Sequence, residues 1–159
     1  MSSAEVDVVK DFLRALDEKN FQKADSYLRE DFVYSAPHPP QPLNREQFMQ
    51  LMESLEVAIP DWSFNYSDVH QQGMTVHATI HITGTNTGEL IAPLLNLPPI
   101  APTGKKIDMP EEHFECGVRD YKIFWLTMHP APGGGFQGLL ERLGITMPPF
   151  KDTGFYEGV

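Results

Sequence analysis

The chain has little cysteine and no long apolar run. Cys116 is the only cysteine among 159 residues, which excludes an internal disulfide and a cysteine-cluster metal site, so nothing requires an oxidising compartment. No apolar run is long enough to cross a bilayer, and residues 1–9 lack the basic segment and apolar core of a secretion signal. We therefore expect a cytoplasmic protein.

Positive charge is also scarce. Twelve lysines and arginines stand against 22 aspartates and glutamates, which gives a formal net charge of −10. Such a charge repels phosphate backbones and anionic lipid, so we expect neither nucleic acid nor a membrane as a partner. What the chain does have is a hydrophobic fraction of 41%, which is enough to bury a core in a single domain spanning residues 1–159.

The N-terminal part of the chain shows helical periodicity. Apolar side chains recur every three or four positions over residues 4–18, which predicts an amphipathic helix, and a second short helix follows over 21–28. Asn44 has the side chain of an N-cap, with Gln47 three residues later, and starts a third helix that ends at Pro60. Three helices therefore precede any long strand.

After the third helix the apolar period changes to two. Apolar and polar residues alternate over 62–67 and 74–83, and residues 110–129 have the pattern of a β-hairpin. A last short helix over 136–143 ends at Gly144. Helices followed by a meander of antiparallel strands predict an α+β fold, in which helices pack on one face of a curved sheet.

The hairpin at 110–129 carries acid–base groups among aromatic residues. With a two-residue turn at its tip, counting outward places Glu112 opposite His129 on one face. A bulge or a slip by one residue would exchange Glu112 for His113 on that face. A carboxyl group beside an imidazole in an apolar pocket can serve as general base and acid, so all three residues are catalytic candidates. An exposed pair at the open end of the hairpin is the alternative interpretation.

Aromatic residues are expected to form the wall of a pocket next to these groups. A flat apolar ligand would be held there by stacking and by burial of its surface. Each of these residues could instead belong to the ordinary core. The ligand-binding candidates are Tyr34, Trp62, Phe64, Tyr66, Phe114 and Trp125.

The sequence predicts neither a metal ion nor a cofactor. His77 and His81 share one face of a strand and could be joined by His113 as metal ligands, but that face is rich in threonine, as polar outer surfaces are. Residues 133–135 are three glycines before a helix, but they lack the lysine of a phosphate-binding loop. His38 stands beside turn residues and is expected to be exposed.

Two apolar features suggest a second subunit. The segment 90–103 is more apolar than a surface loop, so it either forms a lid over the pocket mouth or packs against a partner. Phe124, Leu126 and Met128 alternate with Trp125 and are expected on the outer face of the sheet. Both features favour a homodimer.

A series of short motifs resembles one known family. No single motif is specific, but their order and spacing are typical of the SnoaL-like polyketide cyclases of the NTF2-like superfamily, which the chain resembles over most of its length. The motifs are Leu-Arg-Glu-Asp-Phe-Val at 28–33, Asn-Arg-Glu-Gln-Phe at 44–48, Pro-Asp-Trp at 60–62, Thr-Gly-Thr-Asn-Thr-Gly-Glu-Leu at 83–90, Pro-Thr-Gly-Lys at 102–105, Asp-Tyr-Lys-Ile at 120–123 and Gly-Leu-Leu-Glu-Arg-Leu-Gly at 138–144.

The resemblance implies a cone-shaped α+β barrel, commonly dimeric, whose curved sheet encloses one apolar pocket with helices on its concave face. It also implies a cofactor-free acid–base catalyst of an intramolecular aldol-type ring closure. The acidic or histidine groups of the family, on the pocket face of the last two strands, align with Phe114 and Ala131. Neither side chain can transfer a proton, which leaves Glu112, His113 and His129 as the nearest substitutes.

Three functions follow from these observations. The first is a cofactor-free cyclase or isomerase that removes or returns a proton next to the carbonyl group of a small hydrophobic compound. The second is a domain that binds a hydrophobic ligand without transforming it. The third is a dimeric protein-interaction module, as nuclear transport factors of this superfamily are. Ionisable groups on the hairpin favour the first, and the exchanged family positions favour the second.

Overall fold

The computed structural model describes residues 3–145. It begins with the helices α1 (Ala4–Asp17) and α2 (Phe21–Ser26), and α3 (Arg45–Ala58) follows only after the eight-residue strand β1 (Leu28–Ser35). The expectation that three helices precede any long strand is therefore wrong. The hydroxyl of Ser3 accepts a hydrogen bond from the Val6 amide at 3.0 Å and caps α1. Asn44 and Gln47 form the expected capping box at the start of α3, each side chain accepting from the other residue's amide at 2.9 Å.

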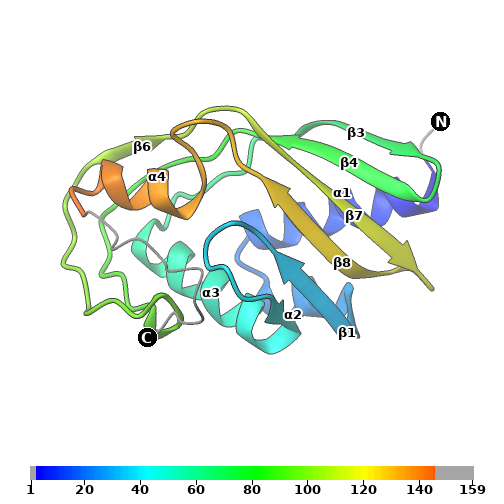
Figure 1. The fold of residues 1–159 in the computed structure, drawn as a ribbon, viewed down its shortest axis with the longest axis horizontal. Helices are drawn as coiled ribbons and strands as arrows, with labels where there is room; N and C mark the ends of the chain where they lie inside the picture. The colour runs from blue at the N-terminus through cyan, green and yellow to red at the C-terminus, as the bar shows by residue number, and fades with distance from the viewer. Residues whose placement is uncertain (1–2, 146–159) are drawn as a thin grey trace.

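The remaining chain forms a curved sheet, a small second sheet and a last helix (Figure 1). The strands of the main sheet follow the order β2-β1-β8-β7-β4-β3, and β5 pairs with β6 separately. In Figure 1, β7 and β8 lie in front of α1, and α4 lies at one end of the sheet. The elements are β1 (Leu28–Ser35), β2 (Leu43–Asn44), β3 (Ser67–Gln72), β4 (Thr75–Ile80), β5 (Thr83–Thr85), η1 (Pro93–Leu95), β6 (Lys106–Asp108), β7 (Glu112–Arg119), β8 (Lys122–His129) and α4 (Gly135–Arg142).

The α+β class is confirmed, whereas two further details of the strands differ from expectation. The sheet is not wholly antiparallel, because β1 pairs with β8 in parallel. Residues 62–67 do not form a continuous strand either. Ser63 makes an isolated bridge to Thr83, regular pairing starts only at Ser67, and Asn65 between them has a φ of 44°. A backbone in that left-handed region leaves the extended conformation, which ends the alternation that the sequence suggested.

The hairpin of β7 and β8 has the expected turn. Asp120 and Tyr121 have φ values of 56° and 62°, as a two-residue hairpin turn requires. Arg119 therefore faces Lys122, as counting predicted. The register then shifts between Gly117 and Val118, so that His113, rather than Glu112, lies opposite His129. The expected pairing of Glu112 with His129 is wrong.

The shift is a β-bulge in β8, and Gly117 allows it. Val118 faces Ile123, but Gly117 faces Trp125, so Phe124 has no partner of its own in β7. A Cβ atom on Gly117 would lie only 2.1 Å from Trp125 Nε1. The indole therefore crosses the strand where a side chain is missing. Beyond the bulge, every residue of β8 faces the other side of the sheet from that predicted.

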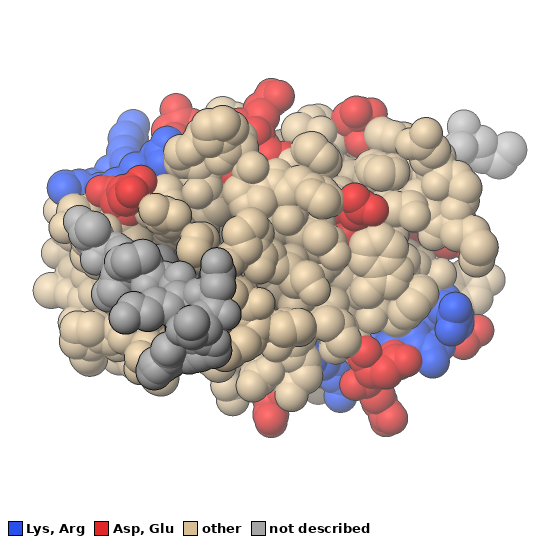
Figure 2. Space-filling view, in the orientation of Figure 1, with Lys and Arg blue, Asp and Glu red and all other residues tan. Residues whose placement is uncertain are grey.

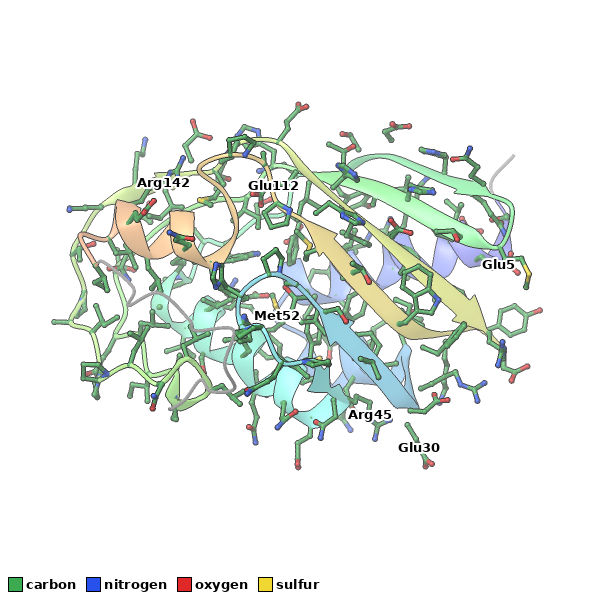
Figure 3. The ribbon with its side chains drawn as sticks, viewed as in Figure 1. Glu5, Glu30, Arg45, Met52, Glu112 and Arg142 are labelled. Carbon is green, nitrogen blue, oxygen red and sulfur yellow. The ribbon has the colours of Figure 1, made fainter. Side chains whose placement is uncertain are left out.

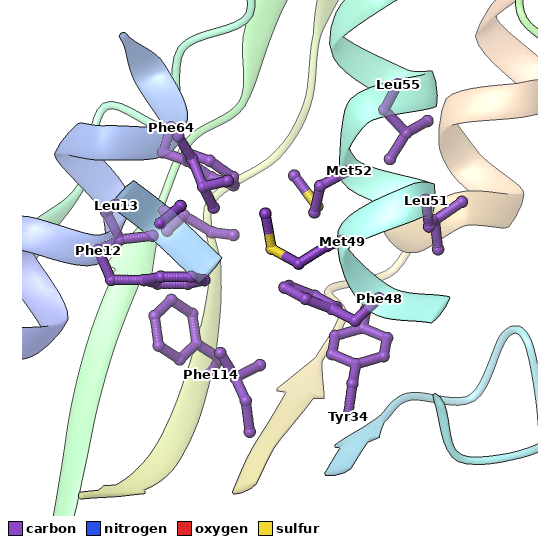
Figure 4. Packing of buried hydrophobic residues seen from close by; sticks show 14 of the residues in the cluster. Phe12, Leu13, Tyr34, Phe48, Met49, Leu51, Met52, Leu55, Phe64 and Phe114 are labelled. Atoms are coloured by element: carbon purple, nitrogen blue, oxygen red, sulfur yellow. The ribbon is translucent and has the colours of Figure 1, made fainter. Parts of the chain in front are cut away.

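This reversal also moves two apolar side chains. Leu126, which is 4% exposed, and Met128 line the interior, although alternation with Trp125 had placed them on the outer face. The core that they join combines aromatic with aliphatic side chains (Figure 4). Phe12 faces Phe114 in that view, while the rings of Phe48 and Tyr34 approach to 4.9 Å between centroids.

The apolar segment at 90–103 lies partly beside α3, where residues 92–94 share a small cavity with Gln50, Leu51 and Ser54. Leu90, Ala92 and Leu95 are buried, and a bridge between Leu90 and Ile100 closes the segment on itself. Asn86 is fully buried and ties this region to the end of α3, because its amide donates to the Ala58 carbonyl at 3.0 Å. Part of the unusual apolar surface of this segment is thus buried, while Ile91 is 51% exposed.

Glu56 is an ionisable residue of α3 that is buried in the core. Its side chain is 2% exposed, and its nearest cation, Lys19 Nζ, lies 3.5 Å from Oε1. Neither carboxylate oxygen accepts a hydrogen bond from residues 3–145. Burial raises the pKa of Glu56 from 4.5 to about 8, although Lys19 opposes the shift. The carboxyl group is therefore protonated in the folded protein at neutral pH.

We expect Glu56→Gln to stabilise the fold above pH 7. Because the folded pKa is raised, the stabilising contribution of protonated Glu56 is complete below pH 4.5 and is lost as pH rises through about 8. At pH 8.5 the variant should gain on the order of 2 kcal/mol in unfolding free energy, and little at pH 5. Urea denaturation at both values measures this. Glu53→Gln, on the exposed side of α3, is the control, and an equal gain at both pH values would contradict the prediction.

Candidate active site

A cavity of about 390 Å³ lies between the sheet and the helices. Its walls come from α1, α3, the inner face of the sheet and the segment that leads into α4. The lining is mostly aromatic and aliphatic, which is typical of a small-molecule site. Its ionisable side chains are Tyr34, His38, Glu112 and Glu141. The chemistry of the cavity therefore depends on few groups.

Glu112 is the most buried carboxylate of this lining. It is the first residue of β7 and is 4% exposed. Its Oε2 atom accepts hydrogen bonds from the Gly135 amide at 2.8 Å and from the Ala131 amide at 3.3 Å. In Figure 3, Glu112 lies at the end of β7 next to α4. The carboxylate thus sits at the N-terminus of that helix, where a negative charge is favoured.

The two carboxylate oxygens of Glu112 have different surroundings. Oε1 accepts no hydrogen bond from any residue in the described range 3–145, while Oε2 is held by two amides. Burial raises the pKa of Glu112, and the amides of Gly135 and Ala131 and the charge of Arg142 counteract only part of that rise. A base with a raised pKa, one anchored oxygen and one free oxygen has the properties needed for proton transfer.

Gly134 makes this arrangement possible. A Cβ atom at this position would lie only 1.5 Å from Glu112 Oε2. The carboxylate therefore approaches the backbone where a side chain is absent. Gly133 and Gly135, with φ values of 78° and 67°, turn the chain into α4 around it. The three glycines thus leave room for the Glu112 carboxylate against the backbone, where a phosphate-binding loop would hold a ligand.

Tyr34 brings a hydroxyl group to the same cavity. It is 7% exposed on β1, and within residues 3–145 its hydroxyl makes no hydrogen bond. Burial raises the pKa of the Tyr34 phenol well above its usual range, and the Glu112 carboxylate raises it further. The phenol is therefore neutral at physiological pH and is available as a hydrogen-bond donor.

His38 is a site residue that the sequence did not indicate. It was expected to be exposed beside turn residues, but it is half-buried and lines the cavity. The loop after β1 carries it back over the cavity that Tyr34 enters from the strand. The only available signal was its closeness to Tyr34 in the sequence, since a chain leaving a pocket-facing strand often stays at the pocket rim.

Four of the six aromatic candidates line the cavity. They are Tyr34, Trp62, Phe64 and Phe114. Trp62 is 5% exposed, and its indole N–H has no acceptor among residues 3–145. Two candidates lie elsewhere. Trp125 is on the outer face because of the bulge, and Tyr66 is at the surface, where its hydroxyl accepts from Arg14 at 3.3 Å.

The two candidate histidines of the hairpin lie outside the cavity. His113 and His129 are exposed on the outer face of the sheet, with ring centroids 5.2 Å apart. His129 Nε2 lies 2.6 Å from Glu115 Oε2. The structure therefore separates both histidines from Glu112, which faces inward. Within residues 3–145, no three His, Cys, Asp or Glu side chains are arranged as metal ligands.

Cys116 lies on the inner face of β7 and is fully buried. Burial raises the pKa of its thiol to about 12, and Glu115 adds to that rise. The thiol therefore stays protonated and unreactive at neutral pH. Cys116 fills space in the core.

A family model matches most of the chain. The model is that of SnoaL-like polyketide cyclases, and the match covers residues 6–124. The chain belongs to this family. A search of curated proteins finds no match to this SnoaL-like chain. None of its helices within residues 3–145 has both the length and the apolar character of a membrane span.

Solved structures share the SnoaL-like fold. AclR from Streptomyces galilaeus, a proposed hydroxylase, has a TM-score of 0.71 at 18% identity, over 91% of this chain and 84% of that one. IdmH from Streptomyces antibioticus, a proposed polyketide cyclase, has a TM-score of 0.68 at 20% identity, over 89% and 99%. A SnoaL-like protein from Jannaschia has a TM-score of 0.66 at 18% identity, over 93% and 95%. At these identities the likeness establishes the NTF2-like fold alone.

Proposed function

We propose that the protein is a cofactor-free acid–base catalyst that moves a proton next to the carbonyl group of a small hydrophobic compound, as a cyclase or an isomerase does. The observation that carries this proposal is the asymmetric Glu112 carboxylate. One oxygen is anchored by the Gly135 and Ala131 amides, and the other, which accepts no hydrogen bond from residues 3–145, belongs to the lining of an apolar cavity. Membership of the SnoaL-like polyketide cyclase family agrees with such chemistry.

The proton transfer balances with the residues that line the cavity. Oε1 of Glu112 takes a proton from the carbon next to the carbonyl, and the C–H electron pair becomes an enolate. The neutral hydroxyl of Tyr34 is a donor that can stabilise the enolate oxygen. Return of the proton to the same or another carbon gives exchange or isomerisation. Attack of the enolate carbon on a second carbonyl of the same molecule closes a ring, and the alkoxide that forms takes the proton held by Glu112, which restores the carboxylate.

The residues that replace the family's acid–base groups fit this scheme. Phe114, at one of the aligned positions, is 2% exposed and adds apolar wall. Ala131, at the other, offers its backbone amide to Glu112 Oε2 at 3.3 Å. The proton-transfer role has in this proposal moved two residues along β7, to Glu112. His113 and His129 have no part in it, because they lie on the outer face.

Exchange of hydrogen for deuterium in a bicyclic ketone tests the proposal. The protein is incubated with 2-tetralone in deuterated buffer, and deuterium next to the carbonyl is followed by mass spectrometry. We expect exchange faster than in buffer alone, with saturation as the cavity fills. Binding of 2-tetralone without faster exchange would instead support a domain that only binds hydrophobic ligands.

We also propose that the protein forms a homodimer through the outer face of the sheet. Val33 is 41% exposed on β1 next to Trp125. Phe124 lies on the same side as Trp125, because a Cβ atom on Gly117 would approach both side chains. Figure 2 views this face, and few charged side chains lie in its middle although the net charge is −10. Apolar and aromatic residues with little charge are typical of the centre of an interface.

Trp125→Glu should convert the dimer to a monomer. The change places a charge in the middle of the proposed interface, on each of two symmetry-related copies. Light scattering of the wild type and the variant at equal concentration measures the mass. Tyr121→Glu, at the 73% exposed hairpin tip, is the control and should stay dimeric. A monomeric wild type at high concentration would contradict the proposal.

A further inference from the structure

Arg142 reaches back from the last turn of α4 to the turn that precedes this helix. Its Nη1 atom donates to the Gly133 carbonyl at 2.7 Å and to the Gly138 carbonyl at 3.0 Å. Among the described residues, Arg142 forms no ion pair with a carboxylate. Figure 3 shows Arg142 on the helix that lies next to Glu112. The guanidinium therefore binds backbone carbonyls of the turn and of α4 rather than a surface carboxylate.

The turn that Arg142 holds is tightly folded. The Gly134 amide donates to the Ala131 carbonyl at 2.8 Å, and the Gly138 amide donates to the Gly134 carbonyl at 3.0 Å. The Gly133 carbonyl packs so closely on α4 that a Cβ atom on Gly138 would lie 2.1 Å from it. Without the guanidinium, this carbonyl would lose its side-chain donor, and the direction of its peptide plane would depend on the hydrogen bond from the Gly134 amide to the Ala131 carbonyl.

The same turn carries the two amides that hold Glu112. Ala131 precedes the Gly133 carbonyl by two residues, and the Gly135 amide follows it by two. A rotation of the peptide at Gly133 would thus move both donors relative to Oε2. Glycines at 133–135 make such a rotation easy, because they tolerate many backbone angles. A restraint on this carbonyl is therefore a restraint on the carboxylate.

We infer that Arg142 is a positioning residue, which fixes the turn at 131–135 so that its amides anchor one oxygen of Glu112 and leave the other free for substrate. The inference rests on the proposed role of Glu112 and extends it to a residue that does not line the cavity. Arg142 acts through the backbone and through its positive charge, without touching the reacting atoms.

The charges around Glu112 determine how its pKa should change when Arg142 is removed. Arg142 on α4 lowers the pKa of Glu112, while Tyr34 on β1 is the other ionisable group electrostatically linked to this carboxylate. His38 and Glu141 line the same cavity. Removing Arg142 weakens the two amide hydrogen bonds and removes a positive charge. Both changes disfavour the carboxylate, so both raise its pKa.

Carbon NMR of protein labelled at glutamate carboxyl carbons tests this without any substrate. The Glu112 signal is identified by its loss in Glu112→Gln and is then followed against pH. In Arg142→Met we expect its midpoint to rise by about 0.5 to 1 pH unit. Arg142→Lys keeps the charge but not the planar fork, so its midpoint should lie between those of the wild type and Arg142→Met. The Gly135 amide should exchange with solvent faster in both variants.

Arg45→Met is the matched control, because Arg45 also donates to a backbone carbonyl, that of Leu28 at 3.3 Å, but away from Glu112. It should leave the Glu112 midpoint unchanged. A lower thermal midpoint in Arg142→Met with an unchanged Glu112 titration would overturn the inference, since Arg142 would then serve stability alone. If Arg142→Met does not fold, unchanged Gly135 amide exchange in Arg142→Lys would overturn it equally. Absence of 2-tetralone exchange in the wild type would reject the proposed function instead.

Discussion

Glu112→Gln is expected to reduce the rate of deuterium exchange into 2-tetralone by about 10²- to 10⁴-fold, the usual contribution of a general base. The amide cannot accept the proton from carbon. Its oxygen can still take the place of Oε2 and accept from Gly135 and Ala131, so the turn before α4 should keep its conformation. Affinity for 2-tetralone should stay within a few fold, because the apolar walls are unchanged.

The matched control for this change is Glu141→Gln. Glu141 also lines the cavity but is exposed on α4. Its removal should leave the exchange rate close to that of the wild type. Mass spectrometry of 2-tetralone over time and a binding titration measure both quantities. A Glu112→Gln protein that exchanges as fast as the wild type would rule out Glu112 as the base and would direct attention to His38.

Gly134→Ala should reduce stability strongly, because the carboxylate that the methyl group meets is buried and held by two amides. The added methyl group and the Glu112 carboxylate cannot occupy the same space, since their atoms would be 1.5 Å apart. The Ala131 carbonyl, 3.0 Å from the methyl position, limits movement to the other side. We expect the free energy of unfolding to fall by about 3 kcal/mol, at the upper end of overpacking costs, and the exchange activity to be lost.

Urea denaturation of Gly104→Ala, of Glu112→Ala and of the double variant Glu112→Ala with Gly134→Ala separates the steric clash from backbone strain. Gly104→Ala places a methyl group where nothing lies within 4 Å, at a positive φ of 72°, so it should cost only about 1 kcal/mol of backbone strain. Gly134 has a φ of −107° and no such strain, so the larger loss expected there comes from the clash. Glu112→Ala combined with Gly134→Ala removes the clash, so the double variant should be more stable than the sum of the two single changes predicts. Simple additivity would show that the carboxylate is not what Gly134 accommodates.

The sequence predicts the helices and the hairpin tip because local chemistry determines them. Asn44 and Gln47 cap α3 from within a single turn, and Asp120 with Tyr121 folds the hairpin tip as short-range rules require. The family resemblance adds the curved sheet with helices on its concave face. These features need no knowledge of which residues distant in the chain come into contact.

The bulge and the site chemistry depend on contacts between distant residues. Trp125 crosses Gly117 from the neighbouring strand, so the register is decided by packing across the sheet and not by the turn. The inward direction of Glu112 was anticipated, but its partners were not. They are amides that lie 19 and 23 residues further along the chain. No periodicity within the hairpin contains that information.

The pH dependence of 2-tetralone exchange tests the central claim most directly. A general base works only when it has lost its proton, and burial raises the pKa of Glu112. The exchange rate should therefore rise with pH, with a midpoint above the usual range of a glutamate and equal to the midpoint of the Glu112 carboxyl signal in the same protein. A rate that is independent of pH through that midpoint, or one that follows a different group, would contradict the account.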